Sequence, residues 1–374
     1  MRGAISLAMS EFSEADRAFM AQALSLAERG LCTTTPNPRV GCVIVRDGLA
    51  IGEGFHARAG LAHAEINALI DAKARGHDPR GATLYVTLEP CSHTGRTPPC
   101  TEAIIAAGVS RVVVAMADPD PAARHGAQRL RAAGIAVDVG LGEDAARELN
   151  AGFISRALRG RPWVRMKVAA SLDGRTALVD GTSQWITGEP ARVDAHRFRA
   201  RACAVMTGIG TVLHDDPQLT VRHVAAARQP RRVVVDRRAE TPPAAKVLHG
   251  GETLIVTAGG RNPAWPSGVE VLELPDAEGR VDLRALMHAL GTRGVNELHV
   301  EGGAGLNGAL IGAGLVDELL LYVAPCLIGD PARGIAALPP GLARLDARVA
   351  LTIHAIDRVG DDLRVVARMI GKEA

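Results

Sequence analysis

The chain has 374 residues, of which 47% are hydrophobic and 22% are charged, a composition typical of a soluble globular protein. This length favours two domains over one. The net charge is only +2 and aromatic residues make up 3%, so the sequence lacks the basic surface and the stacking side chains of a nucleic-acid-binding protein. No apolar run approaches the roughly 20 residues of a membrane span, so we expect no binding to membranes, and the cysteine usage described next favours a cytoplasmic location.

The six cysteines are too few for a disulfide framework in a chain of this length. Two of them, Cys91 and Cys100, belong to the metal-binding motif described below. The others lie among apolar neighbours and are interpreted as buried free thiols, which favours a reducing compartment: Cys32, Cys42, Cys203 and Cys326.

The first residues, 1–11, are interpreted as a disordered extension, because their short apolar stretch is broken by Ser6 and makes a weak signal peptide. Ser13 is a suitable N-cap for a helix whose apolar residues recur at helical spacing until Gly30. A loop follows. The apolar run 40–45 then predicts a buried strand that turns at Asp47-Gly48 into a second strand.

A His-Ala-Glu sequence and two cysteines form the most informative motif. His63 and Glu65 begin an apolar-periodic segment, whereas Cys91 and Cys100 flank a polar, Pro-rich loop after the predicted strand 83–88. One imidazole and two thiolates make three ligands for a tetrahedral zinc and leave the fourth position for water. Glu65 can exchange protons with that water without binding the metal. The plain alternative is a helix cap at His63 and two small buried thiols.

Predicted strands and helices alternate through this half, which indicates an α/β sheet covered by helices. Helices are expected to begin at His63 and at Cys100, so the ligands at two adjacent helix starts can converge on one metal. We expect His56 and His77, which fall outside this geometry, to be exposed to solvent. The half is completed by a helix at 124–133 and by strands at 111–115 and 135–139.

Residues 151–162 are interpreted as a linker, because arginines, Gly160 and Pro162 interrupt the apolar pattern. A second domain begins at Trp163. It is expected to contain a charged helix at 190–200 and strands at 163–170, 202–206, 232–236, 253–257 and 297–300.

The last of these strands leads through Glu301 into a G-x-G-x-x-G sequence, Gly303 to Gly308, at the start of a helix. Glycines at such a turn allow backbone N–H groups to approach a pyrophosphate. The motif comes late in its domain and lacks an acidic residue about 20 positions on, which argues against a Rossmann unit. A different dinucleotide-binding fold and a plain tight turn both remain open.

The strings TTPNPRVGCVIV and PCSHTGRTPPC resemble the deaminase half of the bifunctional deaminase/reductase family of riboflavin biosynthesis, within the cytidine deaminase superfamily. Most superfamily members have Pro-Cys-x-x-Cys, whereas eight residues separate Cys91 from Cys100 here. The strings VAASLDGR, SQWITG, GTVLHDDPQLTVR and VEGGAGLNGAL resemble the reductase half. The resemblance implies an α/β protein with a cytidine-deaminase-like three-layer domain at 12–155 and a dihydrofolate-reductase-like domain at 162–374.

The resemblance further implies Zn²⁺ and NADPH as cofactors, with Glu65 as the catalytic residue of the deaminase. It places in the NADPH groove Ala169, Trp185, Thr211, Asp215, Arg237, Gly303, Ala304, Gly305, Leu306, Asn307, Gly308 and Ala309. It places around the substrate Ser183, Arg199, Leu219, Arg222 and Glu301. Several have plain alternatives: Trp185 could belong to the core, Arg199 could be a solvated helix residue, and Leu219 packs against apolar neighbours.

Three further residues are candidates. Asn37 is either a turn residue between two prolines or an amide that hydrogen-bonds the substrate. Arg96 is either a surface residue or a contact to the phosphoribosyl arm, since a guanidinium suits phosphate. Lys167, like Asp173, lies near the end of a strand and could supply a proton.

Arg237 also bears on the choice of nicotinamide cofactor. The resemblance places position 237 at the adenosine end, where an arginine favours a 2′-phosphate and an acidic residue would bind the free 2′-hydroxyl. Strand alternation should direct Asp236 and Arg237 to opposite faces. The sequence therefore predicts a preference for NADPH. The alternative is that Arg237 and Arg238 are solvated arginines after an edge strand.

The expected function is zinc-dependent hydrolytic deamination of 2,5-diamino-6-(5-phosphoribosylamino)pyrimidin-4-one, followed by NADPH-dependent reduction of its ribosyl side chain to ribityl. We expect a homo-oligomer. One alternative is a zinc-dependent tRNA adenosine deaminase fused to a non-catalytic nucleotide-binding domain. A second is a small-molecule deaminase whose second domain only binds a ligand.

Overall fold

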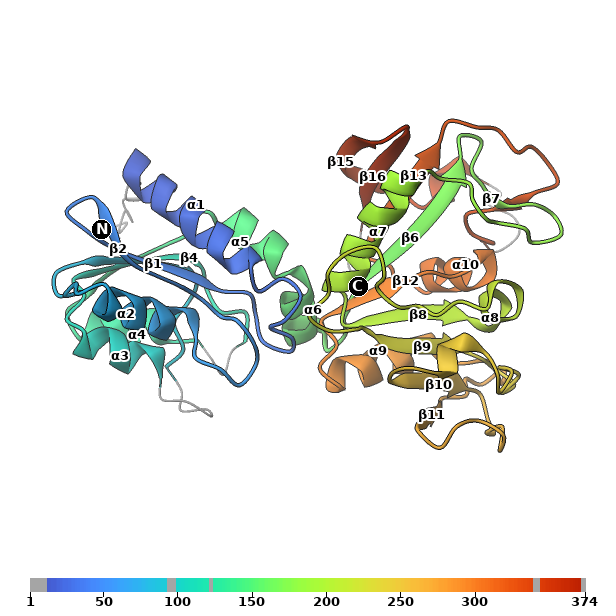
Figure 1. Ribbon diagram of the computed structural model, residues 1–374, viewed down its shortest axis with the longest axis horizontal. Coiled ribbons are helices and arrows are strands. Elements are labelled where there is room, and N and C mark those ends of the chain that lie inside the picture. The colour runs from blue at the N-terminus through green and yellow to red at the C-terminus, as the bar shows by residue number, and fades with distance from the viewer. Residues whose placement is uncertain (1–11, 93–98, 121–123, 339–343, 371–374) are drawn as a thin grey trace, which may run out of the picture. The chain divides into compact units, whose positions relative to one another are not determined.

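The computed structural model of the protein describes residues 12–92, 99–120, 124–338 and 344–370. The chain divides into two compact units, with the boundary between Leu158 and Arg159. Each unit has its own sheet and its own hydrophobic core (Figure 1).

The first unit contains a five-stranded mixed sheet with the order β2-β1-β3-β4-β5. Its strands are β1 (Gly41–Arg46), β2 (Leu49–Phe55), β3 (Thr83–Leu88), β4 (Arg111–Met116) and β5 (Ala136–Val139). Strand β1 pairs antiparallel with β2 and β3, whereas β3, β4 and β5 are parallel. Asp47 and Gly48 both have positive φ, 54° and 76°, and form the predicted turn between β1 and β2.

Helices cover both faces of this sheet, so the unit has the three layers that were expected. Helices α1 (Glu14–Glu28) and α5 (Glu143–Leu149) lie on one face, and α2 (Ala64–Ala74), α3 (Cys100–Ala106) and α4 (Gly126–Ala132) lie on the other (Figure 1). Because both faces are covered, strands β1, β3 and β4 are almost entirely buried.

Two glycines allow helices to approach the sheet closely. A Cβ atom on Gly41 would lie 1.9 Å from the carbonyl oxygen of Ala23 in α1, and one on Gly54 would lie 2.3 Å from that of Ala64 in α2. Any side chain at either position would therefore push a helix away from the sheet. The close packing at Gly54 matters most, because α2 carries two of the predicted site residues.

Residues 151–162, interpreted as a linker, contain the boundary between the two units, but most of the stretch is not irregular. Helix α6 (Ala151–Arg159) occupies most of this stretch. Its arginines do not interrupt a helix, since arginine is a good helix former, and Gly152 and Ser155 are its buried residues. The helix ends only at Gly160, which has a φ of 65°, and Pro162 follows.

The second unit is built on a nine-stranded sheet with the order β11-β10-β9-β8-β12-β6-β13-β16-β15. The strands are β6 (Trp163–Ser171), β8 (Ala204–Gly208), β9 (Arg231–Val235), β10 (Thr253–Thr257), β11 (Val269–Glu273), β12 (Glu297–Val300), β13 (Glu318–Ala324), β15 (Leu351–Val359) and β16 (Asp362–Met369). Seven neighbouring strands, from β11 to β13, are parallel, and β16 and β15 add an antiparallel edge.

The helices of the second unit are α7 (Glu189–Arg201), α8 (Ile209–Asp215), α9 (Leu283–Thr292) and α10 (Ala304–Gly312), with short 3₁₀ turns η1 (Lys246–Leu248) and η2 (Leu345–Ala347). A small ribbon pairs β7 (Arg175–Ala177) with β14 (Arg333–Gly334). The predicted strands of this half are confirmed as β6, β8, β9, β10 and β12, whose carboxyl ends share one edge of the sheet, where α/β proteins bind ligands. Within the described ranges, no helix is long and apolar enough to cross a membrane.

Candidate active sites

Three side chains of the first unit form a metal-ligand cluster. His63 is the N-cap residue of α2, Cys100 is the first residue of α3, and Cys91 follows β3. The His63 Nδ1 atom lies 3.3 Å from Cys100 Sγ and 3.7 Å from Cys91 Sγ. All three donor atoms lie within 4.8 Å of one another. The expectation that ligands at two helix starts converge is confirmed.

The spacing of these atoms fits zinc. With Zn–S near 2.3 Å and Zn–N near 2.0–2.1 Å, tetrahedral ligands should be about 3.6 Å apart for N and S. The two observed N–S distances, 3.3 and 3.7 Å, bracket this value. The backbone N–H of Cys100 also donates to Cys91 Sγ, at 3.3 Å, as expected beside a thiolate.

The charges in this cluster also favour a dication. Hydrogen bonding from the Cys100 thiol and from His63 lowers the pKa of Cys91 to about 4, so Cys91 is a thiolate at neutral pH. Hydrogen bonding to Cys91, burial and the nearby Glu65 carboxyl raise the pKa of Cys100. A second thiolate therefore requires a compensating positive charge, which a bound divalent metal supplies.

Glu65 is 3% exposed in the first turn of α2. Burial raises the pKa of its carboxyl, against the opposing effect of the His63 imidazole. A carboxyl group whose pKa is raised holds a proton more readily than one in water, which suits a general acid–base group. The electrostatic effects of His63 and Cys91 on this carboxyl show that Glu65 lies close to the ligand cluster, whereas its catalytic role stays a prediction.

The prediction that His56 is exposed to solvent is wrong: it is only 2% exposed. Its ring lies edge-on to that of His63, with centroids 5.4 Å apart, and its Nε2 atom lies 3.1 Å from Asn37 Nδ2. The residue follows the end of β2, which delivers it to the site, and burial lowers the pKa of its imidazole. His77 is exposed, as expected.

The remaining expectations for this unit concern Arg96 and the burial of the cysteines. Arg96 lies outside the described residues, as does the neighbouring His93. The six cysteines, all among the described residues, form no disulfide, but only Cys42 and Cys203 of the four predicted buried thiols are buried. Cys32 is partly exposed and Cys326 is fully exposed, because Cys326 lies on a loop beyond the end of β13.

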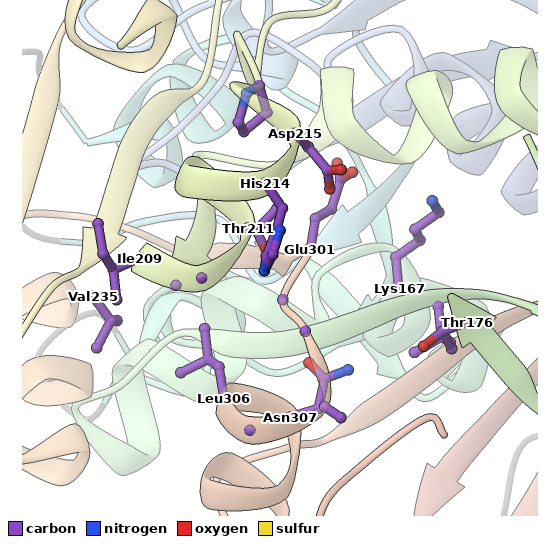
Figure 2. A pocket seen from close by; sticks show the side chains of 18 of the residues that line it. Lys167, Thr176, Ile209, Thr211, His214, Asp215, Val235, Glu301, Leu306 and Asn307 are labelled. Carbon is purple, nitrogen blue, oxygen red and sulfur yellow. The ribbon is translucent and has the colours of Figure 1, made fainter. Parts of the chain in front are cut away.

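The second unit contains a cavity of about 1750 Å³ at the carboxyl ends of its parallel strands. All residues that the sequence assigned to the reductase line this one cavity, and Lys167 does as well. Figure 2 shows Lys167 and Thr176 on one side and the apolar Ile209 and Val235 on the other. The lining includes Ala169, Ser183, Trp185, Arg199, Thr211, Asp215, Leu219, Arg222, Arg237 and residues 301–309.

The polar side of the cavity contains a strong ion pair. The Arg199 guanidinium donates from Nε and Nη2 to the two carboxylate oxygens of Glu301, at 2.7 and 2.8 Å. Burial opposes the charge of Glu301, but Arg199 and the neighbouring His299 and Lys167 hold the pKa of that carboxyl well below its usual value. Arg199 is 9% exposed, so it is not the solvated helix residue of the alternative interpretation.

Lys167 lies on β6 beside this ion pair. Burial lowers the pKa of its ammonium group, Glu301 acts in the opposite direction, and Arg199 adds to the lowering. A lysine with a lowered pKa at the wall of a cavity can donate a proton more readily than one in water.

Trp185 is 67% exposed, which excludes the alternative that it belongs to the core. The Arg192 guanidinium lies over its ring, 4.7 Å from the centroid. Nearby, the Ser183 hydroxyl donates to Asp215 at 3.4 Å, so a predicted substrate residue and a predicted cofactor residue are in contact.

The three glycines of the G-x-G-x-x-G sequence have different roles. A Cβ atom on Gly305 would meet nothing within 4 Å, so this part of the loop is open to the cavity. A Cβ atom on Gly308 would lie 2.0 Å from the carbonyl oxygen of Ala337, so Gly308 serves packing. Asn307 is 2% exposed and its amide donates to the carbonyl oxygen of Ile335 at 2.9 Å.

Asp236 and Arg237 point to different environments, as strand alternation predicted. The Asp236 side chain is fully buried and accepts hydrogen bonds from the Thr241 N–H and hydroxyl, both at 2.7 Å. Arg237 is exposed and lines the cavity, whereas Arg238 pairs with Glu240 at 3.1 Å and is absent from the lining. Asp236 is therefore unable to bind a ribose hydroxyl in the cavity.

Comparison with known proteins agrees with this arrangement. Residues 13–116 match the cytidine and deoxycytidylate deaminase zinc-binding region, and residues 162–365 match the RibD C-terminal domain. Riboflavin biosynthesis protein RibD of Escherichia coli (strain K12) is 47% identical over 362 residues, covering 93% of this chain and 98% of that relative.

Two solved structures are similar over nearly their full length. Acinetobacter baumannii RibD (form 1) has a TM-score of 0.88 at 43% identity and covers 96% of this chain and 99% of its own. The Thermotoga maritima diaminohydroxyphosphoribosylaminopyrimidine deaminase/5-amino-6-(5-phosphoribosylamino)uracil reductase has a TM-score of 0.88 at 33% identity, covering 95% of this chain and 99% of its own.

The two units, the ligand cluster and the cavity define a bifunctional enzyme that joins a deaminase to a reductase of the dihydrofolate reductase type. The chain belongs to the riboflavin biosynthesis protein RibD family, to which both of its halves match. Neither alternative function drawn from the sequence describes this family.

Proposed function

We propose that the first unit hydrolytically deaminates 2,5-diamino-6-(5-phosphoribosylamino)pyrimidin-4-one and that the second unit then reduces the ribosyl side chain with NADPH. The observation that carries the first step is the cluster of His63, Cys91 and Cys100 beside the buried Glu65. The Thermotoga maritima protein, which matches nearly the whole chain, is named as a deaminase and reductase of these pyrimidine substrates. Its name supports the same substrates for this chain.

In the deaminase step, zinc held by His63, Cys91 and Cys100 would supply a water that is acidic enough to act near neutral pH. Glu65 takes a proton from the attacking water and returns it to the amine that departs as ammonia. The carbon that carried the amine becomes a carbonyl carbon, so one water is consumed for each ammonia released. The Asn37 amide, which His56 holds, hydrogen-bonds the pyrimidine or its ribose in this proposal, and the Asn37–His56 contact supports that role.

In the reductase step, NADPH bound along the open glycine loop would supply the hydride for C1 of the ring-opened ribosyl imine. Lys167 donates the proton that the imine nitrogen requires. Arg199 and Glu301 orient the substrate next to it, and Arg222 contributes positive charge for the phosphate. Among the described residues, Arg222 has no carboxylate partner, and its guanidinium has only weak contacts at 3.4 and 3.5 Å to Thr220 and Gln218.

We also propose that the protein is a homo-oligomer. Strand β15 is the edge of the nine-stranded sheet, and it exposes Ile353 at 60% and Ile356 at 57%. An exposed apolar edge strand favours pairing with another chain. Light scattering of the purified protein tests this, and a monomeric mass at micromolar concentration would contradict it.

A two-step assay tests the proposed function. The diaminopyrimidine substrate is supplied with NADPH, and ammonia and NADPH are followed separately. Ammonia should be released without NADPH, and NADPH should be oxidised only after deamination. Release of ammonia from RNA, but not from this nucleotide, would overturn the proposal.

A further inference from the structure

The segment from Asp216 to Arg222 forms one border of the reductase cavity, between α8 and β9. Leu219 is 3% exposed and has a φ of 53°, a left-handed conformation that is unfavourable for leucine. Among the described residues, the Leu219 N–H has no hydrogen-bond acceptor, and Leu219 lines the cavity. The segment therefore has a strained backbone with one N–H that lacks an acceptor among the described residues, and it requires outside support.

Side chains from other parts of the unit provide that support by binding the backbone of residues 220–222. Arg199 donates from Nη1 to the carbonyl oxygen of Thr220 at 2.6 Å. His196 accepts the Arg222 N–H on Nδ1 at 3.2 Å. Gln229 binds Val221 twice: its Oε1 accepts the N–H at 2.7 Å and its Nε2 donates to the carbonyl oxygen at 3.2 Å.

Gln229 differs from the other two supports. Arg199 itself lines the cavity, so its loss would remove a substrate contact as well as a backbone contact. Gln229 is exposed and is not among the residues that line the cavity. Its two hydrogen bonds to Val221 take the place of those that a neighbouring β-strand would make. Its effect on a ligand must therefore pass through the backbone at Val221.

We propose that Gln229 is a positioning residue, assisted by His196, that holds segment 219–222 in the conformation that receives the phosphate end of the reductase substrate. This inference rests on the proposed function. A phosphate dianion suits the free Leu219 N–H and the Arg222 guanidinium, which lie at the two ends of the supported segment. Without Gln229 the segment occupies other conformations. The apparent affinity for the substrate then falls in proportion to the fraction of molecules whose segment keeps the binding-competent conformation.

The principal test is Gln229→Ala with the deaminated substrate, 5-amino-6-(5-phosphoribosylamino)uracil. The KM for this substrate should rise about tenfold, a change that two net hydrogen bonds can produce. The kcat and the KM for NADPH should stay within about twofold, because neither hydride transfer nor the glycine loop depends on the segment. Gln229→Glu should be intermediate, since it keeps the acceptor for the Val221 N–H but loses the donor.

Arg228→Ala is the matched control. Arg228 precedes Gln229 and also makes two backbone contacts, but to the carbonyl oxygens of Ala202 and Arg201 at 2.9 and 3.4 Å. Arg228→Ala should lower the melting temperature about as much as Gln229→Ala does, and it should leave the KM for the uracil nucleotide unchanged. His196→Asn, which keeps an acceptor near the Nδ1 position, should retain a KM closer to wild type than His196→Ala.

Calorimetric titration with ribose 5-phosphate tests the positioning role without turnover, and Gln229→Ala should bind it about tenfold more weakly. If the wild type binds this probe but does not reduce the uracil nucleotide, the proposed function fails while the positioning role is still decided. An unchanged KM and unchanged binding in Gln229→Ala would overturn the inference. An equal rise of KM in Arg228→Ala would do the same, because it would show a general loss of stability.

Discussion

Asn37 and His56 form a hydrogen-bonded pair in which the imidazole fixes the orientation of the amide. The His56 Nδ1 atom lies 3.1 Å from the carbonyl oxygen of Ala62, which can only accept, so Nδ1 carries the proton. Nε2 is then the acceptor of the Asn37 amide N–H at 3.1 Å. Among the described residues, nothing else hydrogen-bonds the Asn37 side chain, so its second N–H and its carbonyl oxygen can bind a ligand.

The Asn37–His56 pair predicts that substitution of either residue lowers the affinity of the deaminase for its substrate. Asn37→Ala should raise the KM for deamination by about tenfold, because one or two hydrogen bonds to the substrate are lost. His56→Ala should have a similar but smaller effect, since it frees the amide without removing it. Both variants should reduce the deaminated substrate at the wild-type rate. A normal deamination KM in Asn37→Ala would show that Asn37 is a turn residue only.

The ligand set predicts which cysteines hold the metal. Cys100→Ser should lose most of the approximately one zinc per chain, together with deaminase activity, because serine is a poor ligand without thiolate character. Cys42→Ser is the control: Cys42 is equally buried but lies in β1, and its zinc content should be normal. Zinc is measured by atomic emission on dialysed protein. Full zinc in Cys100→Ser would contradict the ligand set and make His93 the next candidate.

The ligand cluster could be predicted from the sequence for a physical reason. Each ligand lies at or next to the end of a regular element, and one imidazole with two thiolates is a typical ligand set for zinc. The residue pairs that shape the sites were not predictable in this way. His56 and Asn37 are both loop residues, and Gln229 meets Val221 across an irregular loop. Neither contact follows from periodicity or composition.

The reductase site was placed from the sequence only by family resemblance. Arg199 and Glu301 are 102 positions apart, and their ion pair depends on α7 packing beside the end of β12. The carboxy-terminal hairpin of β15 and β16 was not predicted, because β15 exposes both apolar and polar side chains and so lacks an alternating pattern. Helix α6 was not predicted, because its arginines were taken as breaks in the helical pattern, although arginine is a good helix former.

Arg237 predicts the preference between cofactors. Wild type should favour NADPH over NADH, and Arg237→Ala should lose about 10- to 150-fold of that preference, the value of a charged hydrogen bond of about 1.5–3 kcal/mol. Catalytic efficiency with each cofactor is the measurement. Arg238→Ala should keep the preference, because Arg238 pairs with Glu240 away from the cavity. Equal efficiency of the wild type with both cofactors would exclude the role of Arg237.

His196 predicts a pH dependence of the stability of the second unit. Burial lowers the pKa of His196 to about 3, below its ordinary value of 6.5. The unfolded chain therefore binds a proton that the folded chain does not, and stability is lost as pH falls below 6.5. The loss should be on the order of 1 kcal/mol between pH 7.5 and 5.5. Thermal unfolding of His196→Asn should show a smaller difference between these two pH values; the same difference as wild type would contradict the assignment.

Glu65→Gln tests the central claim, that the two chemical steps belong to two independent sites, most directly. The change keeps the shape of the side chain but removes the group that carries protons. A single experiment compares wild type and Glu65→Gln on the diaminopyrimidine substrate and on its deaminated product, following ammonia and NADPH together. Deamination should fall about 10²- to 10⁴-fold with zinc retained, whereas NADPH oxidation on the deaminated product should be unchanged. A parallel collapse of both activities would show that the sites are shared and would contradict the account.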